Sequence, residues 1–238
     1  MFMEIDADAR RFITWRVRSG FYTSDEIVDT VAQWIVDEQP ETTLSQAKRA
    51  IRPIVGLEWA GQLERQQSWP RDQPTISDKL SKAFASLERN HGILARMNLA
   101  CCQTCGIAEI SGDSDEDTRG YVFFHAQDTE TVALEGGDLS LAFGSFTKSE
   151  RRNRAIGDVT VKSLRRAGLS VEWDGDAAKR ITVHCEQWRR RIGEDEEVQD
   201  VGDEDFDTEC FSSDESDSAL ESVGISDVEA EEMGLLRR

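Results

Sequence analysis

Apolar residues in the first part of the chain recur every three or four positions, which is the spacing of one face of an α-helix. The first stripe consists of Ile27, Val31, Trp34 and Ile35. It follows Thr23, a residue type that caps helix N-termini. A second helix is predicted over residues 44–67, where Pro53 should kink or break it. A third should begin near Ser77 and end at His91, so residues 1–92 are predicted to form a helical region.

Between residues 93 and 192 the pattern changes to short β-rich segments separated by turn residues. The candidate strands cover residues 107–110, 120–125, 138–144, 169–173 and 180–185. Two helices are expected over residues 129–134 and 153–167. Because residues 121–124 are apolar on both faces, their strand should lie inside a sheet. The predicted fold class is α+β: an N-terminal helical region followed by a small α/β sandwich of about five strands and two helices over residues 93–192.

The end of the chain, residues 193–238, is dominated by acidic side chains. It holds 18 Asp and Glu against 2 Lys and Arg, a net charge of −16 out of −19 for the whole protein. With few aromatic residues, this segment buries too little apolar surface to offset the entropy of ordering it. We therefore expect a disordered acidic C-terminal tail. Its scattered aliphatic residues suit a short motif that folds on a protein partner, and a purely solvating role stays open.

Composition and cysteine usage indicate which cellular compartment and which classes of partner to expect. No window approaches the roughly 18 consecutive apolar residues of a membrane span, and the first residues lack the basic and apolar regions of a signal peptide. Five cysteines are an odd number and are not spread as a disulfide framework. We expect a cytoplasmic protein without a membrane partner. Arginines cluster at 151–154, 165–166 and 189–191, but no basic recognition helix accompanies them, so nucleic acid is not the expected partner.

Candidate site chemistry concentrates in the motif CCQTCG at residues 101–106. Its Cys102 and Cys105 have the spacing of a zinc knuckle, and the glycine that follows leaves the backbone room to turn. A structural zinc site needs two more ligands. His125 ends one candidate strand and Cys185 ends another, so either can approach the knuckle if those strands are its neighbours. The predicted metal ligands are Cys102, Cys105, His125 and Cys185, and the predicted ion is zinc.

Two other interpretations of the same residues stay open. In the first, the cysteines, including the spare Cys101, are small buried hydrophobic residues and His125 is a hydrogen-bonded core histidine. In the second, His125 lowers the pKa of one cysteine, which then acts as a nucleophile or redox centre. Asp128 is the obvious third member of such a site, but we expect it to cap a helix that begins at Thr129.

The motifs CCxTCG, GYVFFHxQDTE, LxVEWDG and WRRR resemble a bacterial family labelled only as a domain of unknown function. The resemblance covers roughly residues 16–192 and stops before the acidic tail. It implies no activity, substrate or cofactor. The sequence therefore leaves two functions open. One is a non-enzymatic cytoplasmic binding or regulatory module with a structural zinc site. The other is an enzyme that uses a thiol or an open metal site near Cys102, Cys105 and His125.

Overall fold

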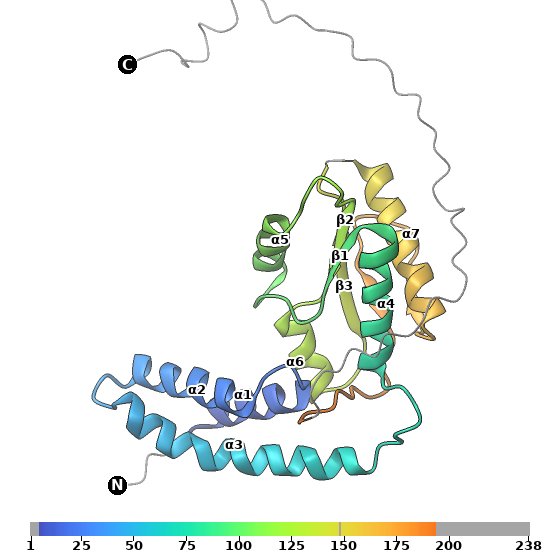
Figure 1. The fold of residues 1–238 in the computed structure, drawn as a ribbon. Coiled ribbons are helices and arrows are strands. Elements are labelled where there is room, and N and C mark those ends of the chain that lie inside the picture. The colour runs from blue at the N-terminus through green and yellow to red at the C-terminus, as the bar shows by residue number, and fades with distance from the viewer. Residues whose placement is uncertain (1–4, 148, 194–238) are drawn as a thin grey trace, which may run out of the picture. The chain divides into compact units, whose positions relative to one another are not determined.

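The computed structural model describes residues 5–147 and 149–193. These residues form seven helices and a five-stranded mixed sheet, which confirms the predicted α+β class (Figure 1). The helices are α1 (Ala7–Ser19), α2 (Ser24–Glu38), α3 (Leu44–Gln67), α4 (Ile76–His91), α5 (Gln103–Gly112), α6 (Ala126–Leu134) and α7 (Glu150–Arg166). The strands are β1 (Ile93–Arg96), β2 (Gly120–Phe123), β3 (Leu139–Gly144), β4 (Val171–Glu172) and β5 (Ile181–Val183). Apart from Gly193, the predicted acidic tail lies outside the described residues.

Threonine residues start three of the first four helices. Thr23, Thr43 and Thr75 each accept a hydrogen bond from the amide of the third helical residue, whose side chain accepts one from the threonine amide in return. This reciprocal arrangement satisfies donors that the first turn of a helix otherwise leaves without partners. At its other end, α4 stops at Gly92, whose φ of 62° is left-handed and suits glycine. Two local signals used in the predictions, Thr23 and Gly92, are therefore among those that set the boundaries, whereas the caps at Thr43 and Thr75 were not predicted.

The helix α3 is continuous through Pro53, so the predicted break is wrong. Pro53 is exposed, whereas Ile51 and Val55 on either side of it are buried against α1 and α2. Proline removes one backbone hydrogen bond, and on the solvent side of a helix water can replace that bond. The buried side chains of the same turn keep the helix in register with its neighbours.

The sheet has the strand order β1-β2-β3-β5-β4. β1 pairs with β2 in parallel, and the other neighbours are antiparallel. β2 lies inside the sheet, as its two-sided apolar sequence predicted. The segment 107–110, expected to be a strand, lies instead in α5, so that prediction is wrong. Residues 93–96 form the edge strand β1, which was not among the candidates.

Helices cover both faces of the sheet (Figure 1). On one face, α4 and α7 bury Leu80, Phe84 and Leu164 against strand residues such as Val122 and Ile181. On the other face, a smaller cluster joins Ile110 of α5 to Phe123 and Ala142 of the sheet. The successive β2 residues Val122 and Phe123 thus belong to different cores, as strand geometry requires.

A third core holds α1, α2 and α3 together, and the segment after β5 connects it to the sheet. Ile13, Val31 and Ile51 are completely buried in this helical core. Trp188 donates its indole N–H to the carbonyl of Ser19 at 3.0 Å, and its ring contacts Phe124 beside the sheet. The two predicted regions therefore share a buried polar and aromatic contact. Among the described helices, none is long and apolar enough to cross a membrane.

Candidate three-cysteine metal site

The cysteine motif follows β1 on a turn that several backbone contacts hold in place. Asn98 and Ala100 have φ values of 54° and 53°, the left-handed region that costs a residue with a side chain about 1–2 kcal/mol. The amide of Leu99 donates to the carbonyl of Phe124 at 2.9 Å, and the amide of Ala126 donates to the carbonyl of Ala100 at 3.1 Å. The turn is therefore attached to the end of β2 and the start of α6. Strained backbone that its surroundings enforce in this way is often found at functional sites.

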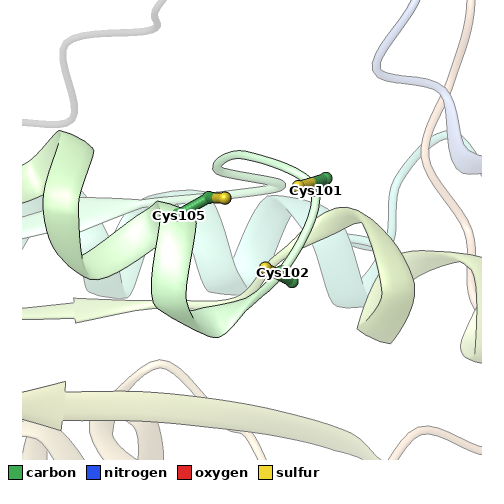
Figure 2. Close-up of side chains that lie close together, drawn as sticks. All are labelled: Cys101, Cys102 and Cys105. Carbon is green, nitrogen blue, oxygen red and sulfur yellow. The ribbon is translucent and has the colours of Figure 1, made fainter.

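The turn brings three thiols together at the surface. The sulfur atoms of Cys101, Cys102 and Cys105 all lie within 4.8 Å of one another. Figure 2 shows the three side chains pointing toward a common space. Cys101 and Cys105 are exposed and Cys102 is half-buried. This group, which we call the three-cysteine site, is the only set of three or more candidate ligands found in the described part of the chain.

At the start of α5, the pKa values of Cys102 and Cys105 are shifted in opposite directions. Cys102 is the N-cap residue of α5, and Cys105 is the third residue of that helix. No side-chain hydrogen bond caps the helix, yet the Cys105 amide lies close enough to the Cys102 sulfur to favour its thiolate. The pKa of Cys102 is lowered by that amide first and then by the neighbouring thiols. The same neighbours, Cys101 foremost, raise the pKa of Cys105 to about 11.

Gly106, the last residue of the motif, is required by packing rather than by a turn. It lies inside α5, and its amide donates to the carbonyl of Cys102 at 2.9 Å as in any helix. A Cβ atom at this position would lie 2.5 Å from a ring carbon of Phe123. Only glycine therefore lets the first turn of α5 approach the sheet this closely. The sequence pattern suggested that this glycine gives the backbone room to turn. In the structure, it instead allows this close contact.

His125 is a neighbour of the turn but has a different role. It is the N-cap residue of α6: its Nδ1 accepts the Asp128 amide at 3.3 Å, and the Asp128 carboxylate accepts the His125 amide at 3.2 Å. Asp128 is also bound by two nitrogens of Arg180, at 3.0 and 2.6 Å. Burial lowers the pKa of His125 and favours its neutral ring; the charge of Asp128 opposes this shift and that of Arg180 adds to it. The prediction that Asp128 caps a helix starting at Thr129 is wrong, because α6 begins three residues earlier.

Cys185 lies in the core under α4 and α7. Its side chain is 3% exposed, its sulfur lies 3.5 Å from the carbonyl oxygen of Val183, and burial raises its pKa to about 11. The three-cysteine site instead adjoins α5, whose residues pack on the opposite face of the sheet. Of the four predicted ligands, the structure groups Cys102 and Cys105, and it does not place His125 or Cys185 in that group.

The residue that sequence reasoning set aside was Cys101. It was treated as a spare because the zinc-knuckle pattern uses only two cysteines separated by two residues. Cys101 belongs to the three-cysteine site because the backbone at Ala100 is left-handed and turns the chain there. The adjacent Cys101 and Cys102 then direct their sulfurs to one space. The doubled cysteine was the only local signal for this arrangement.

The fold and the site together define an α+β protein with a surface cluster of thiols. The chain belongs to the family described as Domain of unknown function (DUF6891), whose model matches residues 3–192. The match spans both the helical region and the sheet, and it ends where the acidic segment begins. It confirms the resemblance to a domain of unknown function. No curated protein and no solved structure matches the chain.

Proposed function

We propose that the protein is a non-enzymatic cytoplasmic binding or regulatory module that holds one zinc ion on Cys101, Cys102 and Cys105. The observation that supports this proposal is that three sulfurs lie within 4.8 Å of one another on one turn, which backbone hydrogen bonds hold in place. Thiolates are soft ligands that favour zinc and copper(I) over calcium or magnesium. A reducing cytoplasm would keep these exposed thiols available for metal.

The donor set fits the size of a zinc ion. Zinc binds thiolate sulfur at about 2.3 Å in a tetrahedron, so bound sulfurs are about 3.8 Å apart. The three sulfurs need to close by about 1 Å at most from their 4.8 Å limit. Because two of the side chains are exposed, rotation about their χ1 angles can supply this movement without disturbing a core.

Three protein ligands leave the fourth coordination position of zinc to another donor. A structural zinc site normally has four protein ligands, whereas a site with three holds water or a bound molecule in the fourth position. The structure supplies three ligands within the described residues. We propose that the fourth donor is external, either water or a side chain of a partner protein. An exposed zinc ion would then be the contact through which the module binds.

A second candidate function, thiol chemistry, is favoured by the position of Cys102 at the start of α5. The lowered pKa of this residue gives it more thiolate at neutral pH than an ordinary cysteine. The groups that lower the pKa of Cys102 are helix amides and the neighbouring thiols, and His125 is not among them. Any thiol chemistry would therefore depend on the helix start rather than on a Cys–His pair.

Elemental analysis tests the zinc proposal. The full chain is purified under reducing conditions with added zinc, and bound metal is measured after a competing chelator of known affinity. We expect one zinc ion per chain, with an affinity that Cys101→Ser, Cys102→Ser and Cys105→Ser each lower by at least about tenfold.

Two control variants define the ligand set. Cys185→Ala removes a buried thiol outside the three-cysteine site and should leave zinc binding unchanged. Cys210→Ser removes the one cysteine that lies outside the described residues, and as the second control it should also leave zinc binding unchanged. A zinc content that the three site variants do not change, or that Cys185→Ala abolishes, contradicts the proposal.

A further inference from the structure

Cys102 and Cys105 are spaced for a disulfide bond as well as for a metal. They occupy the N-cap and the third position of α5, so only two residues separate them. Helix geometry places Cα atoms three residues apart about 5 Å from each other, and a disulfide needs Cα atoms roughly 4.4–6.8 Å apart. Their sulfurs already lie within 4.8 Å of each other. Rotation of exposed side chains can therefore bring them to bonding distance.

The adjacent pair, Cys101 and Cys102, is a much poorer choice. Consecutive Cα atoms joined by a trans peptide are about 3.8 Å apart, which is below the usual disulfide range. The chain has no cis peptide bonds within its described residues, so the ordinary spacing applies here. Of the two pairs that include Cys102, the pair with Cys105 is therefore the one that has the spacing of a disulfide.

The surface position makes both sulfurs accessible to small oxidants. Cys105 is exposed and Cys102 is half-buried, whereas the thiol of Cys185 is buried in the core. Cys102 and Cys105 are also two of the three thiols that the zinc proposal uses. A disulfide bond between them would leave Cys101 as the single remaining thiolate of the site.

We propose that Cys102 and Cys105 form an oxidation site, in which hydrogen peroxide converts the two thiols to a disulfide and thereby displaces the zinc ion. The displacement rests on the proposed function, whereas formation of the disulfide rests on the thiol geometry alone. The three-cysteine site then has a reduced, metal-binding state and an oxidised, metal-free state. Such a site couples the binding activity of the module to peroxide.

The chemistry balances with peroxide as the only oxidant. One thiolate attacks a peroxide oxygen, so that an S–O bond forms, the O–O bond breaks and hydroxide leaves. The second sulfur attacks the resulting sulfenic sulfur, so that the S–S bond forms, the S–O bond breaks and a second hydroxide leaves. The two hydroxides take up the thiol proton and a solvent proton to give two waters. The two sulfurs supply the two electrons that reduce the peroxide.

Peptide mapping of the metal-free full chain after peroxide treatment tests the disulfide. We expect the loss of two hydrogens per chain and a Cys102–Cys105 cross-link that dithiothreitol reverses. Cys101→Ser should keep this cross-link, and Cys185→Ala should not alter it. Cys105→Ser should instead give a sulfenic acid that dimedone traps at Cys102. A cross-link to Cys101, or no cross-link under peroxide that oxidises the site, overturns the proposal.

Zinc release separates this inference from the proposed function. With zinc-loaded protein, peroxide should release most of the bound zinc and buffer alone should not, and dithiothreitol with added zinc should restore binding. If zinc binds but no disulfide forms, the oxidation site is wrong and the zinc site stands. If the disulfide forms in a chain that binds no zinc, the zinc proposal and the displacement are both wrong.

Discussion

At the scale of single residues, the first turn of α5 makes two similar thiols behave differently. Cys102, as the N-cap residue, has a sulfur that faces helix amides, and its pKa falls below the ordinary value of 9.0. Cys105 lies three residues later beside two other thiols, and its pKa rises to about 11. The thiolate is the reactive form of cysteine, so reactivity should follow this order.

Alkylation of the metal-free protein tests this order. Because the pKa of Cys102 is lowered, its iodoacetamide reaction should rise and level off at a lower pH than that of Cys105. The rate at Cys105 should keep rising until the pH approaches about 11. Site-resolved mass spectrometry over a pH series measures both profiles. Faster alkylation of Cys105 than of Cys102 at neutral pH would show that the start of α5 does not set their acidities.

His125 should act as a helix cap and not as a ligand. Asparagine can also cap a helix, so His125→Asn should change the free energy of unfolding by less than about 1 kcal/mol, whereas His125→Ala should cost about 1 kcal/mol or more. Neither variant should change zinc affinity. Urea unfolding and the chelator competition measure the two effects separately. A loss of zinc affinity in His125→Asn equal to that in Cys101→Ser would make His125 a ligand.

At the scale of elements, α5 is held to the sheet by a contact that excludes any side chain at Gly106. The nearest ring carbon of Phe123 lies 2.5 Å from the position of an added Cβ, and Phe123 is completely buried. The ring has no space into which to move without disturbing β2. The element that carries Cys105 and has Cys102 as its N-cap residue is therefore positioned by a glycine and an aromatic ring.

Alanine substitutions at two glycines of α5 test this contact. Gly106→Ala gains about 1 kcal/mol of helix propensity but overpacks the core, so we expect a net loss of about 1–2 kcal/mol in unfolding free energy and weaker zinc binding. Gly112→Ala is the matched control, because its Cβ would meet nothing within 4 Å. It should be neutral or stabilising by up to about 1 kcal/mol. Equal effects of the two substitutions would remove the role assigned to Phe123.

Elements with strong local signals were predictable from sequence, and those that depend on distant contacts were not. Thr23 marked the start of α2 and Gly92 marked the end of α4 directly. In contrast, β1 has four residues and exists because it pairs with β2, which lies more than twenty residues away. The segment 107–110 suits either a strand or a short helix, and contact with Phe123 decides between them.

The same division applies to the candidate site. The local pattern CCxTCG located the thiols, since all three lie within five residues. The choice of further ligands depended on which face of the sheet each strand end meets, and that information is not local. Cys185 enters the core under α4 and α7, and His125 is used by its own helix. Sequence reasoning therefore located the motif but not which further residues lie beside it.

At the scale of the whole molecule, the segment after β5 connects the helical core to the sheet. The Trp188 indole donates to the carbonyl of Ser19, and the Arg190 guanidinium donates to the carbonyl of Gly20 at 3.1 Å. Gln66 of α3 exchanges two hydrogen bonds with the backbone of Ile192, at 2.9 and 3.0 Å. These contacts join residues more than 120 positions apart, so both regions should unfold together.

Replacement of Trp188 tests this connection. Trp188→Phe keeps an aromatic ring but leaves the Ser19 carbonyl without its donor, so we expect a loss of about 1–3 kcal/mol in unfolding free energy. Trp173→Phe is the control, because its indole bonds to an exposed carbonyl of Asp176 and water can replace it. A single unfolding transition in both variants agrees with joint unfolding. Separate transitions for the helical core and the sheet in the wild-type protein would disprove it.

X-ray absorption at the zinc edge tests the central claim most directly. The three-cysteine site predicts three sulfur neighbours at about 2.3 Å and one lighter atom, oxygen or nitrogen, in the fourth position. Cys101→Ser should reduce the sulfur count by one, and Cys185→Ala should leave the spectrum unchanged. A shell of four sulfurs, a shell with fewer than three, or a spectrum that Cys101→Ser does not alter would contradict an open zinc site built on these three residues.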